Sequence, residues 1–375
     1  MKGIELKTVG LIVNPVAGMG GAVGLKGSDG EEVLRRAREL GAEPQAPLRA
    51  ARALRALKDG SPGFKLYTYP GEMGEDEAVQ AGLKPNVVGE ITRGRTTARD
   101  TREAASALAD LGVDLLFFAG GDGTARDIYE AVDSRVTVLG IPSGVKVHSG
   151  VYAATPEAAG HLAASYLRGE VAETRDAEVM DIDEEAFREN RLSARLYGYM
   201  RIPYAPQYLQ GSKEGGASQE PLDLEAIAAD IVEEMNPGTL YIVGPGSSTA
   251  PVLKQLGLEK TLLGVDVVRG GELVASDANE KQILGLLVGS KAKIIVTVIG
   301  GQGFIFGRGN QQISPAVIRA VGKKNIIVVA APQKLASLRG RPLRVDTGDP
   351  ELDEELRGFM RVVTGYGRRT IIKVA

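Results

Sequence analysis

The chain has 375 residues, of which 43% are hydrophobic and 25% charged, with a formal net charge of −3, as expected of a globular protein long enough for two domains. It contains no cysteine and two histidines, which excludes disulfides, thiolate nucleophiles, iron–sulfur clusters and cysteine zinc sites, and is too few for a typical histidine metal centre. The small net charge without a Lys/Arg block argues against a nucleic-acid partner, and the absence of a signal-peptide core or a membrane-length apolar run predicts a cytoplasmic protein with no membrane partner.

Short β-rich runs alternate with helix-like stretches over the first half of the chain. We expect strands at 9–15, 64–70, 114–120 and 136–144, and helices at 31–40, at 97–112 and around Asp127 and Tyr129. These strands are continuous apolar runs separated by helices, a pattern typical of a parallel sheet that is covered on both faces. The first half is therefore predicted to be a parallel α/β domain.

The second half begins less regularly and then returns to the same alternation. Two strands are expected at 177–183 and 195–203, and the polar, glycine-rich segment 211–221 is a candidate loop or linker. Strand, glycine turn and helix then recur at 238–257, 293–322 and 325–332. We predict a first α/β lobe at 1–160, a second α/β lobe at 161–345, and a C-terminal helix and strand at 346–375 that dock on one lobe, with a ligand crevice between the lobes.

An apolar strand ends abruptly at Gly120-Gly121-Asp122-Gly123-Thr124, and a helix-like segment follows at once. Ligands of open parallel sheets bind beyond the carboxyl ends of the strands, where glycines and a helix N-terminus favour a phosphate. Asp122 would repel that phosphate unless it holds Mg²⁺ against it or takes a proton from an attacking hydroxyl. The motif thus points to phosphoryl transfer; the alternative is a tight turn in which Asp122 caps the helix.

Two further glycine-rich turns follow the first strand and the strand at 136–144, so three turns are expected to converge on one crevice. The phosphate-binding candidates on these two turns are Asn14, Gly18, Gly20, Gly21, Lys146 and Ser149. A surface role is the alternative for Lys146, and His148 could aid proton transfer, contact phosphate or be structural. Neither a P-loop nor a complete G-x-G-x-x-G is present, which argues against a dehydrogenase.

Three glycine-rich segments of the second lobe are candidates for binding the phosphate acceptor. Polar groups that suit a phosphate, a base or a ribose lie at the turn 244–250, at a hairpin with Asp266 and Asp277, and in the loop 299–315. The candidates are Gly246, Ser247, Ser248, Thr249, Asp277, Gly301, Gly303, Arg308 and Asn310. The alternatives are capped turns, solvated hairpin carboxylates and a plain connecting loop.

The combination of "NPVAGMGG", "FFAGGDGTARD" and "GIPSGVKVHSGVYA" resembles the ATP-NAD kinase family, within a superfamily that includes diacylglycerol and sphingosine kinases. It is most similar to the prokaryotic AcoX-like branch, predicted to contain ATP- or polyphosphate-dependent NAD kinases. The resemblance covers residues 9–155. The family's Asn-Glu pair and Gly-Ser-Thr-Ala turn have counterparts at 279–280 and 244–250 in the opposite order, and its second domain is largely β, whereas this one is expected to be α/β.

The resemblance implies a Mg²⁺-dependent kinase that transfers a phosphoryl group from ATP or polyphosphate to the 2′-hydroxyl of the adenosine ribose of NAD. Asp122 would activate that hydroxyl and hold the metal, and Asn14 would orient the nucleotide-side loop. Gly120, Gly121, Gly123 and Thr124 would line the phosphates. The resemblance also implies a homo-oligomer.

Two other functions remain open at this stage. A kinase of the same superfamily could act on a lipid, a polyol or another nucleotide, although no basic amphipathic segment supports docking on a membrane. A nucleotide-sensing protein without turnover could bind its ligand between the lobes.

Overall fold

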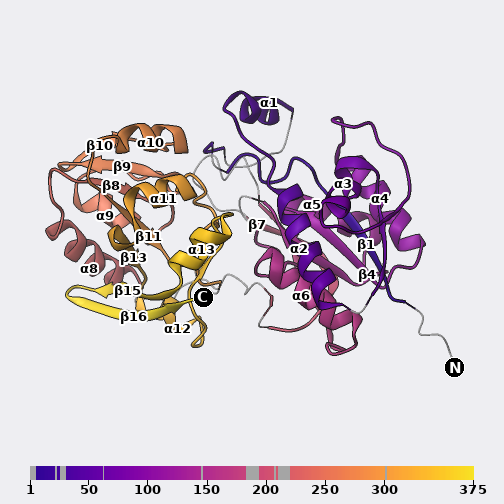
Figure 1. Cartoon of the computed structure of the whole chain (residues 1–375). Helices are drawn as coiled ribbons and strands as arrows, with labels where there is room; N and C mark the ends of the chain where they lie inside the picture. The colour runs from indigo at the N-terminus through magenta and orange to yellow at the C-terminus, as the bar shows by residue number, and fades with distance from the viewer. Residues whose placement is uncertain are drawn as a thin grey trace.

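The computed structural model describes residues 6–21, 23–25, 31–61, 63–144, 147–182, 194–206, 208–209, 220–299 and 302–375. Two of the candidate residues, Lys146 and Gly301, lie outside these ranges, as does most of the polar segment 211–221. The chain forms two lobes that lie side by side, the N-terminal lobe in indigo to magenta and the second in orange to yellow (Figure 1). None of the described helices has both the length and the apolar character needed to cross a bilayer.

The first lobe is built on a five-stranded parallel sheet, as the alternating pattern predicts. The strands are β1 (Thr8–Val13), β2 (Lys65–Thr68), β3 (Asn86–Val87), β4 (Leu115–Gly120) and β5 (Val138–Pro142). Their order is β3-β2-β1-β4-β5, and every neighbouring pair is parallel. The carboxyl ends of all five strands therefore lie at the same edge, which is where the glycine-rich turns begin.

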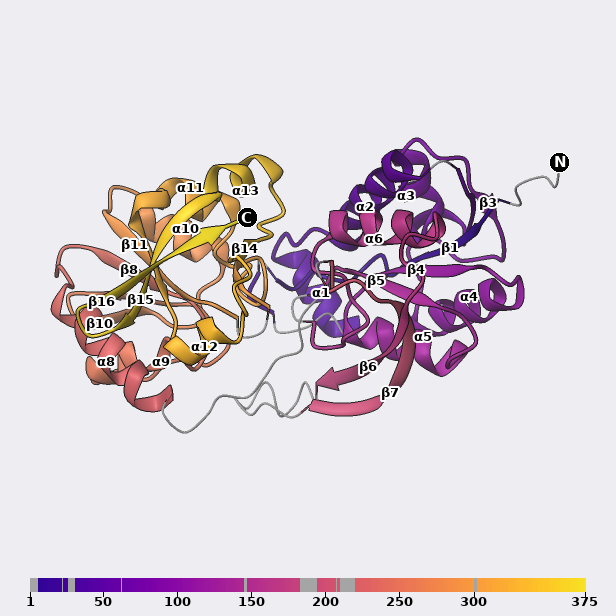
Figure 2. The same ribbon diagram turned by 90° about the horizontal axis from the view of Figure 1, so that it is seen from below.

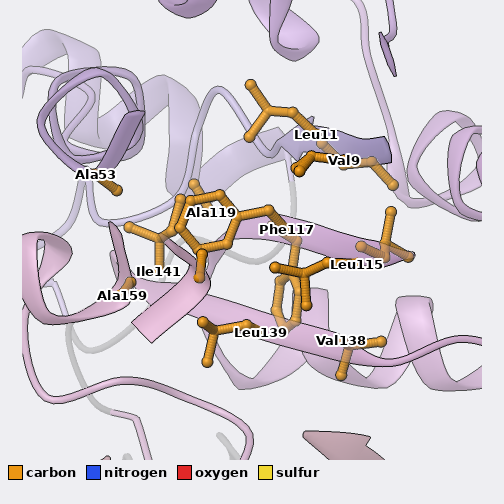
Figure 3. Packing of buried hydrophobic residues seen from close by; sticks show 14 of the residues in the cluster. Val9, Leu11, Ala53, Leu115, Phe117, Ala119, Val138, Leu139, Ile141 and Ala159 are labelled. Carbon is orange, nitrogen blue, oxygen red and sulfur yellow. The ribbon is translucent and has the colours of Figure 1, made fainter. Parts of the chain in front are cut away.

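Helices cover both faces of this sheet (Figure 2). The helices are α1 (Glu31–Glu39), α2 (Ala46–Gly60), α3 (Glu75–Gln80), α4 (Ala98–Asp110), α5 (Asp122–Val132) and α6 (Pro156–Leu167), with a 3₁₀ turn at Gly71–Met73. α2, α3 and α6 lie on one face, and α4 and α5 on the other. All six residues of β4 are buried because helices pack on both sides of it, and Figure 3 shows Phe117 of β4 among side chains of β1 and β5.

A long hairpin, β6 (Thr174–Ile182) with β7 (Ala194–Pro203), also belongs to the first lobe. Its inward side chains, Val179 and Met200 among them, join the hydrophobic cluster of the first sheet, and that cluster extends to Leu209. The predicted boundary at residue 160 falls inside α6, which packs closely on α2. The described chain thus leaves the first lobe at Leu209 and enters the second at Glu220.

The second lobe contains a mixed seven-stranded sheet with the order β10-β9-β8-β11-β13-β15-β16. Its central strands are parallel, and both edges end in antiparallel hairpins. The strands are β8 (Leu240–Val243), β9 (Asp266–Arg269), β10 (Glu272–Ala275), β11 (Ala292–Thr297), β13 (Ile326–Val329), β15 (Gly358–Gly365) and β16 (Arg368–Val374), with β12 (Phe304–Phe306) and β14 (Arg344–Val345) forming a separate pair. The predicted C-terminal helix and strand are part of this lobe, where two strands rather than one complete the sheet.

Helices cover both faces of the second sheet too, so the lobe is α/β as predicted (Figure 2). Successive residues of β11 point to opposite faces, and Ile294 and Ile295 belong to different hydrophobic clusters. One cluster includes α10 (Glu280–Leu287), α11 (Pro315–Val321) and α13 (Pro350–Leu356); the other includes α8 (Glu220–Glu233) and α9 (Ala250–Gln255), with α12 (Pro332–Ala336) on the same side.

Gly160 allows α6 to touch α2 backbone to backbone. A Cβ atom at this position would lie 2.3 Å from the carbonyl oxygen of Ala53 and 2.8 Å from the nitrogen of Leu57.

We expect Gly160→Ala to lower the free energy of unfolding by about 1–3 kcal/mol, since the helices must separate. The matched control is Gly285→Ala on exposed α10, where nothing lies within 4 Å; it should raise that free energy by up to about 1 kcal/mol. Calorimetry of the two variants measures both effects, and equal signs would contradict this account.

Glu77 of α3 is a buried carboxyl group, only 3% exposed, and its Oε2 atom has no hydrogen-bond partner among the described residues. Burial raises the pKa of Glu77 from 4.5 to about 7. Between these two values the folded state binds more protons than the unfolded state, so the stability from this group is present below the lower value and is lost as the pH rises toward 7.

We therefore expect Glu77→Gln to raise the unfolding temperature at pH 8 and to change it little at pH 5. The matched control is Glu90→Gln, an exposed position that should show no such difference between the two pH values. Thermal melts of the three proteins at both pH values provide the test. A Glu77→Gln shift that is the same at pH 5 and pH 8 would rule out the buried carboxyl as its cause.

Candidate active site

The three glycine-rich turns of the first lobe meet at the carboxyl edge of its sheet. Asn14, directly after β1, donates from Nδ2 to the hydroxyl of Thr124 at 2.9 Å, which joins the first turn to the second. The amide of Ser143, directly after β5, donates to the carbonyl of Gly120 at 2.9 Å and joins the third turn to the second. The predicted convergence of these turns is therefore present.

Two glycines of these turns are needed for the packing of the turns on one another. A Cβ atom at Gly18, whose φ is +82°, would lie 2.2 Å from the carbonyl oxygen of Ser143. A Cβ atom at Gly120 would lie 2.4 Å from the side chain of Thr124. The space at Gly18 is filled by the backbone of the turn after β5, and the space at Gly120 is filled by the side chain of Thr124, which Asn14 binds.

Asp122 is the first residue of α5, is 7% exposed, and binds the turn that follows β5. Its Oδ1 accepts hydrogen bonds from the amide of Ser149 at 3.0 Å and from the Ser149 hydroxyl at 2.7 Å. Its Oδ2 accepts from the amide of His148 at 2.8 Å and lies 3.2 Å from Nδ1 of the same residue. The carboxylate thus fixes a loop that lies 26 residues away in sequence instead of acting as a simple helix cap.

The same contacts bear on the expected metal. A carboxylate has about four lone-pair sites, and four donor contacts already surround Asp122. In this arrangement Asp122 does not fit a direct Mg²⁺ ligand. Among the described residues, no group of three or more His, Cys, Asp or Glu side chains could hold a metal ion.

Ser149 is fully buried and bound on two sides, so it positions Asp122 and is not exposed to a phosphate. Besides contacting Asp122, its hydroxyl oxygen accepts from the amide of Met180 in β6 at 3.0 Å. Through Ser149 the hairpin β6–β7 supports the site.

Tyr152 is a residue of this region that the sequence analysis did not select. Its hydroxyl donates to the carbonyl of Gly121 at 2.5 Å, and its ring lies edge-on to Phe118 with centroids 5.4 Å apart. A Cβ atom at Gly140 would lie 2.3 Å from this ring. A buried tyrosine hydroxyl needs a hydrogen-bond partner. A tyrosine this close to the third glycine-rich turn was therefore the sequence signal that could have identified the contact.

The loop after β12 in the second lobe lies against the glycine-rich turn of the first lobe. A Cβ atom at Gly21 would lie 3.0 Å from Cβ of Gln311, and one at Gly24 would lie 3.7 Å from Cβ of Asn279. Asn279 itself is the N-cap of α10, where it forms a capping box with Gln282. Residues of both lobes therefore meet at this turn.

A buried cluster of three charged side chains joins the lobes beside this contact. Asp346 of the second lobe, 1% exposed, lies 2.6 Å from Nη1 of Arg49 in α2 and 3.2 Å from Nη2 of Arg308. Arg308 also donates to the carbonyl of Ala154 at 2.8 Å, which belongs to the first lobe. Burial lowers the pKa of Arg308 to about 10, so the cluster contains two guanidinium groups and one carboxylate at neutral pH. Arg308 was predicted to bind the acceptor; in the structure it links the two lobes through Asp346 and the carbonyl of Ala154.

The other second-lobe candidates are also held by protein contacts. Asn310 donates to the carbonyl of Ile305 at 2.9 Å and accepts from the amide of Gly307, which shapes the loop. Gly303 has a φ of +80°, and a Cβ atom there would lie 3.2 Å from the carbonyl oxygen of Pro342. These residues build the loop and give no direct sign of a ligand contact.

The turn after β8 contains Ser247, which is exposed, and two buried hydroxyl groups. Ser248 accepts from Nζ of Lys334 at 2.6 Å, and Thr249 donates to the carbonyls of Gly244 and Gly246. Lys334 was not predicted, because it follows β13, a different strand.

Asp277 lies at the base of the β9–β10 hairpin, with its amide bonded to Asp266 at 2.9 Å. Asp266 is fully buried and pairs with Lys260 at 2.8 Å, so this carboxylate is neutralised by the protein. In the described structure the acidic residues of this hairpin therefore have a structural role.

The chain matches two family models that together cover most of its length. The ATP-NAD kinase N-terminal domain matches residues 9–171, and the ATP-NAD kinase C-terminal domain matches residues 237–374. The first match contains all three glycine-rich turns, and the second contains most of the second lobe, which is α/β as predicted.

Solved structures give weaker similarities. Two structures of a "putative diacylglycerol kinase from Bacillus anthracis str. Sterne" are 17% identical over 48% of this chain, with TM-scores of 0.25 and 0.26. The matches span less than half of those proteins, 46% and 43% of their chains. A UDP-N-acetylglucosamine 2-epimerase is 11% identical over 92% of this chain and 80% of its own, with a TM-score of 0.25. TM-scores this low do not establish a shared fold. Among curated proteins there is no significant match.

The charge cluster between the lobes predicts a large effect of Asp346→Asn. Without the carboxylate two buried guanidinium groups face each other unpaired, so we expect the free energy of unfolding to fall by about 3–5 kcal/mol. The matched control is Arg99→Ala, which removes the exposed pair with Glu103 and should cost about 0.5 kcal/mol or less. Urea unfolding of both variants measures the difference, and equal losses would show that the cluster does not join the lobes.

Proposed function

Because the chain belongs to the ATP-NAD kinase family, whose members are phosphotransferases, we propose that it transfers a phosphoryl group from ATP or polyphosphate to NAD. The acceptor atom is the 2′-hydroxyl of the adenosine ribose, and the product is NADP. Both substrates are nucleotides or phosphate chains, in keeping with an enzyme of the cytoplasm. Assembly as a homo-oligomer, expected from the resemblance, is carried over as part of the same proposal.

The placement of Asp122 carries the proposal. It is a buried carboxylate at the start of an eleven-residue helix, at the carboxyl edge of a parallel sheet, where three glycine-rich turns meet. Phosphoryl transfer needs positioning, neutralisation of charge and an oriented nucleophile more than it needs covalent chemistry by the protein. A rigidly held polar group beside a phosphate-binding turn supplies the orientation.

The donor phosphates are proposed to bind at the start of α5 and along the turn after β1. The first backbone N–H groups of a helix have no intrahelical acceptor and carry partial positive charge, which favours an anion. Gly123 is half-buried in the first turn of α5, and Gly20 and Gly21 are buried in the turn after β1, so we assign the phosphate contacts to backbone N–H groups of these two segments. Lys146 would add a positive charge. Mg²⁺, if the reaction uses it, would be held by the phosphates of the donor and would neutralise their charge, because Asp122 does not fit a direct ligand.

NAD is proposed to bind where the two lobes meet. Gln311 and Asn279 of the second lobe lie beside the turn that contains Gly21 and Gly24 of the first, so a nucleotide at this turn would contact both lobes. The turn with Ser247 is a further candidate for the acceptor, because it exposes a hydroxyl group after β8.

A kinase that acts on another acceptor of the same superfamily is the second candidate. The observation that favours it is the α/β architecture of the second lobe, which differs from the largely β acceptor domain that the resemblance implies. A nucleotide-binding protein without turnover is the third candidate and predicts binding with no product.

The first test is an assay of the purified protein with Mg²⁺, NAD and either ATP or polyphosphate, with NADP as the readout. Formation of NADP supports the proposal and names the donor. Binding of ATP without NADP, followed by transfer to a polyol, lipid or other nucleotide, supports the second candidate. Binding with no transfer to any of these acceptors supports the third.

We expect Asp122→Asn to lower the rate of NADP formation by about 10²-fold or more, in the range typical of lost acid–base groups, while the protein stays folded. The matched control is Asp127→Asn on the same helix, an equally buried carboxylate that pairs with Arg102 and should keep near-normal turnover. Circular dichroism establishes that both variants are folded. Turnover of Asp122→Asn equal to that of the control would contradict the proposed role.

A further inference from the structure

We propose that the atom which receives the proton of the attacking hydroxyl is Nε2 of His148, and that Asp122 acts through this ring by orienting it. The inference rests on the proposed phosphotransfer and names a residue of its site that neither the family match nor the motif assigns.

The Asp122 carboxylate has no lone pair left to accept a hydrogen bond from a substrate. Oδ1 accepts two hydrogen bonds from Ser149, and Oδ2 has two donor contacts from His148. Two of these donors are backbone amides and a third is the hydroxyl of a fully buried serine, so they are fixed by the fold. A substrate hydroxyl would have to displace one of them to reach the carboxylate.

The contact with Asp122 determines which ring nitrogen of His148 carries the hydrogen. A carboxylate only accepts hydrogen bonds, so the contact between Nδ1 and Oδ2 is a hydrogen bond when Nδ1 carries the hydrogen. In the neutral ring the hydrogen is then absent from Nε2, which keeps its lone pair as an acceptor. Asp122 and His148 thereby form the carboxylate–imidazole pair that orients a base in other hydroxyl-activating sites.

The His148 ring is held at its base and has no hydrogen-bond partner at Nε2 among the described residues. The His148 side chain is 14% exposed, and within the described ranges no residue hydrogen-bonds Nε2. The backbone on either side is anchored, because the amide of His148 binds Asp122 and the amide of Gly150 donates to the carbonyl of Glu178 at 2.8 Å. A fixed ring with one acceptor atom that no described residue binds suits the orientation of a hydroxyl.

The proposed transfer forms one bond to phosphorus and breaks one. The acceptor oxygen forms a bond to the terminal phosphorus of the donor, and the bond from that phosphorus to its bridging oxygen breaks, so that the electron pair leaves with ADP or the shortened polyphosphate. The hydroxyl proton moves to Nε2, and the imidazolium that results is stabilised by the Asp122 carboxylate. The proton then passes to water and the neutral ring returns.

Two substitutions at the same position separate the functions of the two ring nitrogens. His148→Asn retains an N–H donor near Nδ1 and so keeps the contact with Asp122, but it has no atom at Nε2. His148→Gln places an amide oxygen near Nε2, so it retains an acceptor while it loses the contact at Nδ1. The matched control is His161→Asn, at the exposed second histidine of the chain, on α6.

We expect His148→Asn to lower kcat by about 10²- to 10³-fold, as lost base catalysis does, with KM for NAD and for the donor changed by less than about threefold. His148→Gln should retain more activity than His148→Asn, because it still orients the hydroxyl. His161→Asn should match the original protein. A kcat of His148→Asn within about threefold of the original, in a protein that makes NADP, overturns the inference and leaves the proposed function intact.

A measurement on the free protein tests the orientation without an assay. Long-range ¹H–¹⁵N NMR spectra distinguish the two tautomers, and the two histidines can be assigned with His161→Asn. We expect the neutral His148 ring to carry its hydrogen on Nδ1, and this preference to be lost in Asp122→Asn. A hydrogen on Nε2 in the original protein overturns the inference whatever the assay shows.

The two proposals fail in different ways. If the original protein transfers phosphate to no acceptor, the proposed function falls, and the proton step assigned to His148 falls with it, even if the Nδ1–H tautomer is found. If it does transfer phosphate and either the NMR or the His148→Asn result is contrary, only the inference about His148 falls.

Discussion

The site depends on one carboxylate that ties together parts of the chain far apart in sequence. Asp122 begins α5, and its hydrogen bonds reach the turn after β5, which Ser149 in turn connects to β6. Hydrogen bonds to an ionised group are stronger than those between neutral groups, so this arrangement fixes the turn firmly. The glycines around it serve the same end, because Gly18 lets the turn after β1 approach the backbone at Ser143, and Gly120 makes room for the side chain of Thr124.

The parallel strands of both lobes have glycine turns at their carboxyl ends, and the turn after β1 meets the second lobe. The two family models match the two lobes separately, one at residues 9–171 and the other at 237–374. Under the proposed function, the first lobe supplies the phosphotransfer chemistry and the second lobe decides the acceptor.

The strands and glycine turns of the first lobe could be predicted because each rests on a local pattern. β4 is a continuous apolar run that ends at three glycines, and β1 and β5 have the same form. The partners of Asp122 could not be predicted, since they lie 26 and 27 residues away and depend on the path of the turn. The pairing of Arg49 with Asp346 joins residues 297 apart in sequence, and no local signal marks it.

The charge cluster at the lobe boundary also opposes separation of the lobes. Asp346 and Arg308 belong to the same lobe and Arg49 to the other, so separation would move the buried guanidinium of Arg49 away from its carboxylate. It would also break the hydrogen bond from Arg308 to the carbonyl of Ala154, so two buried contacts would be lost together.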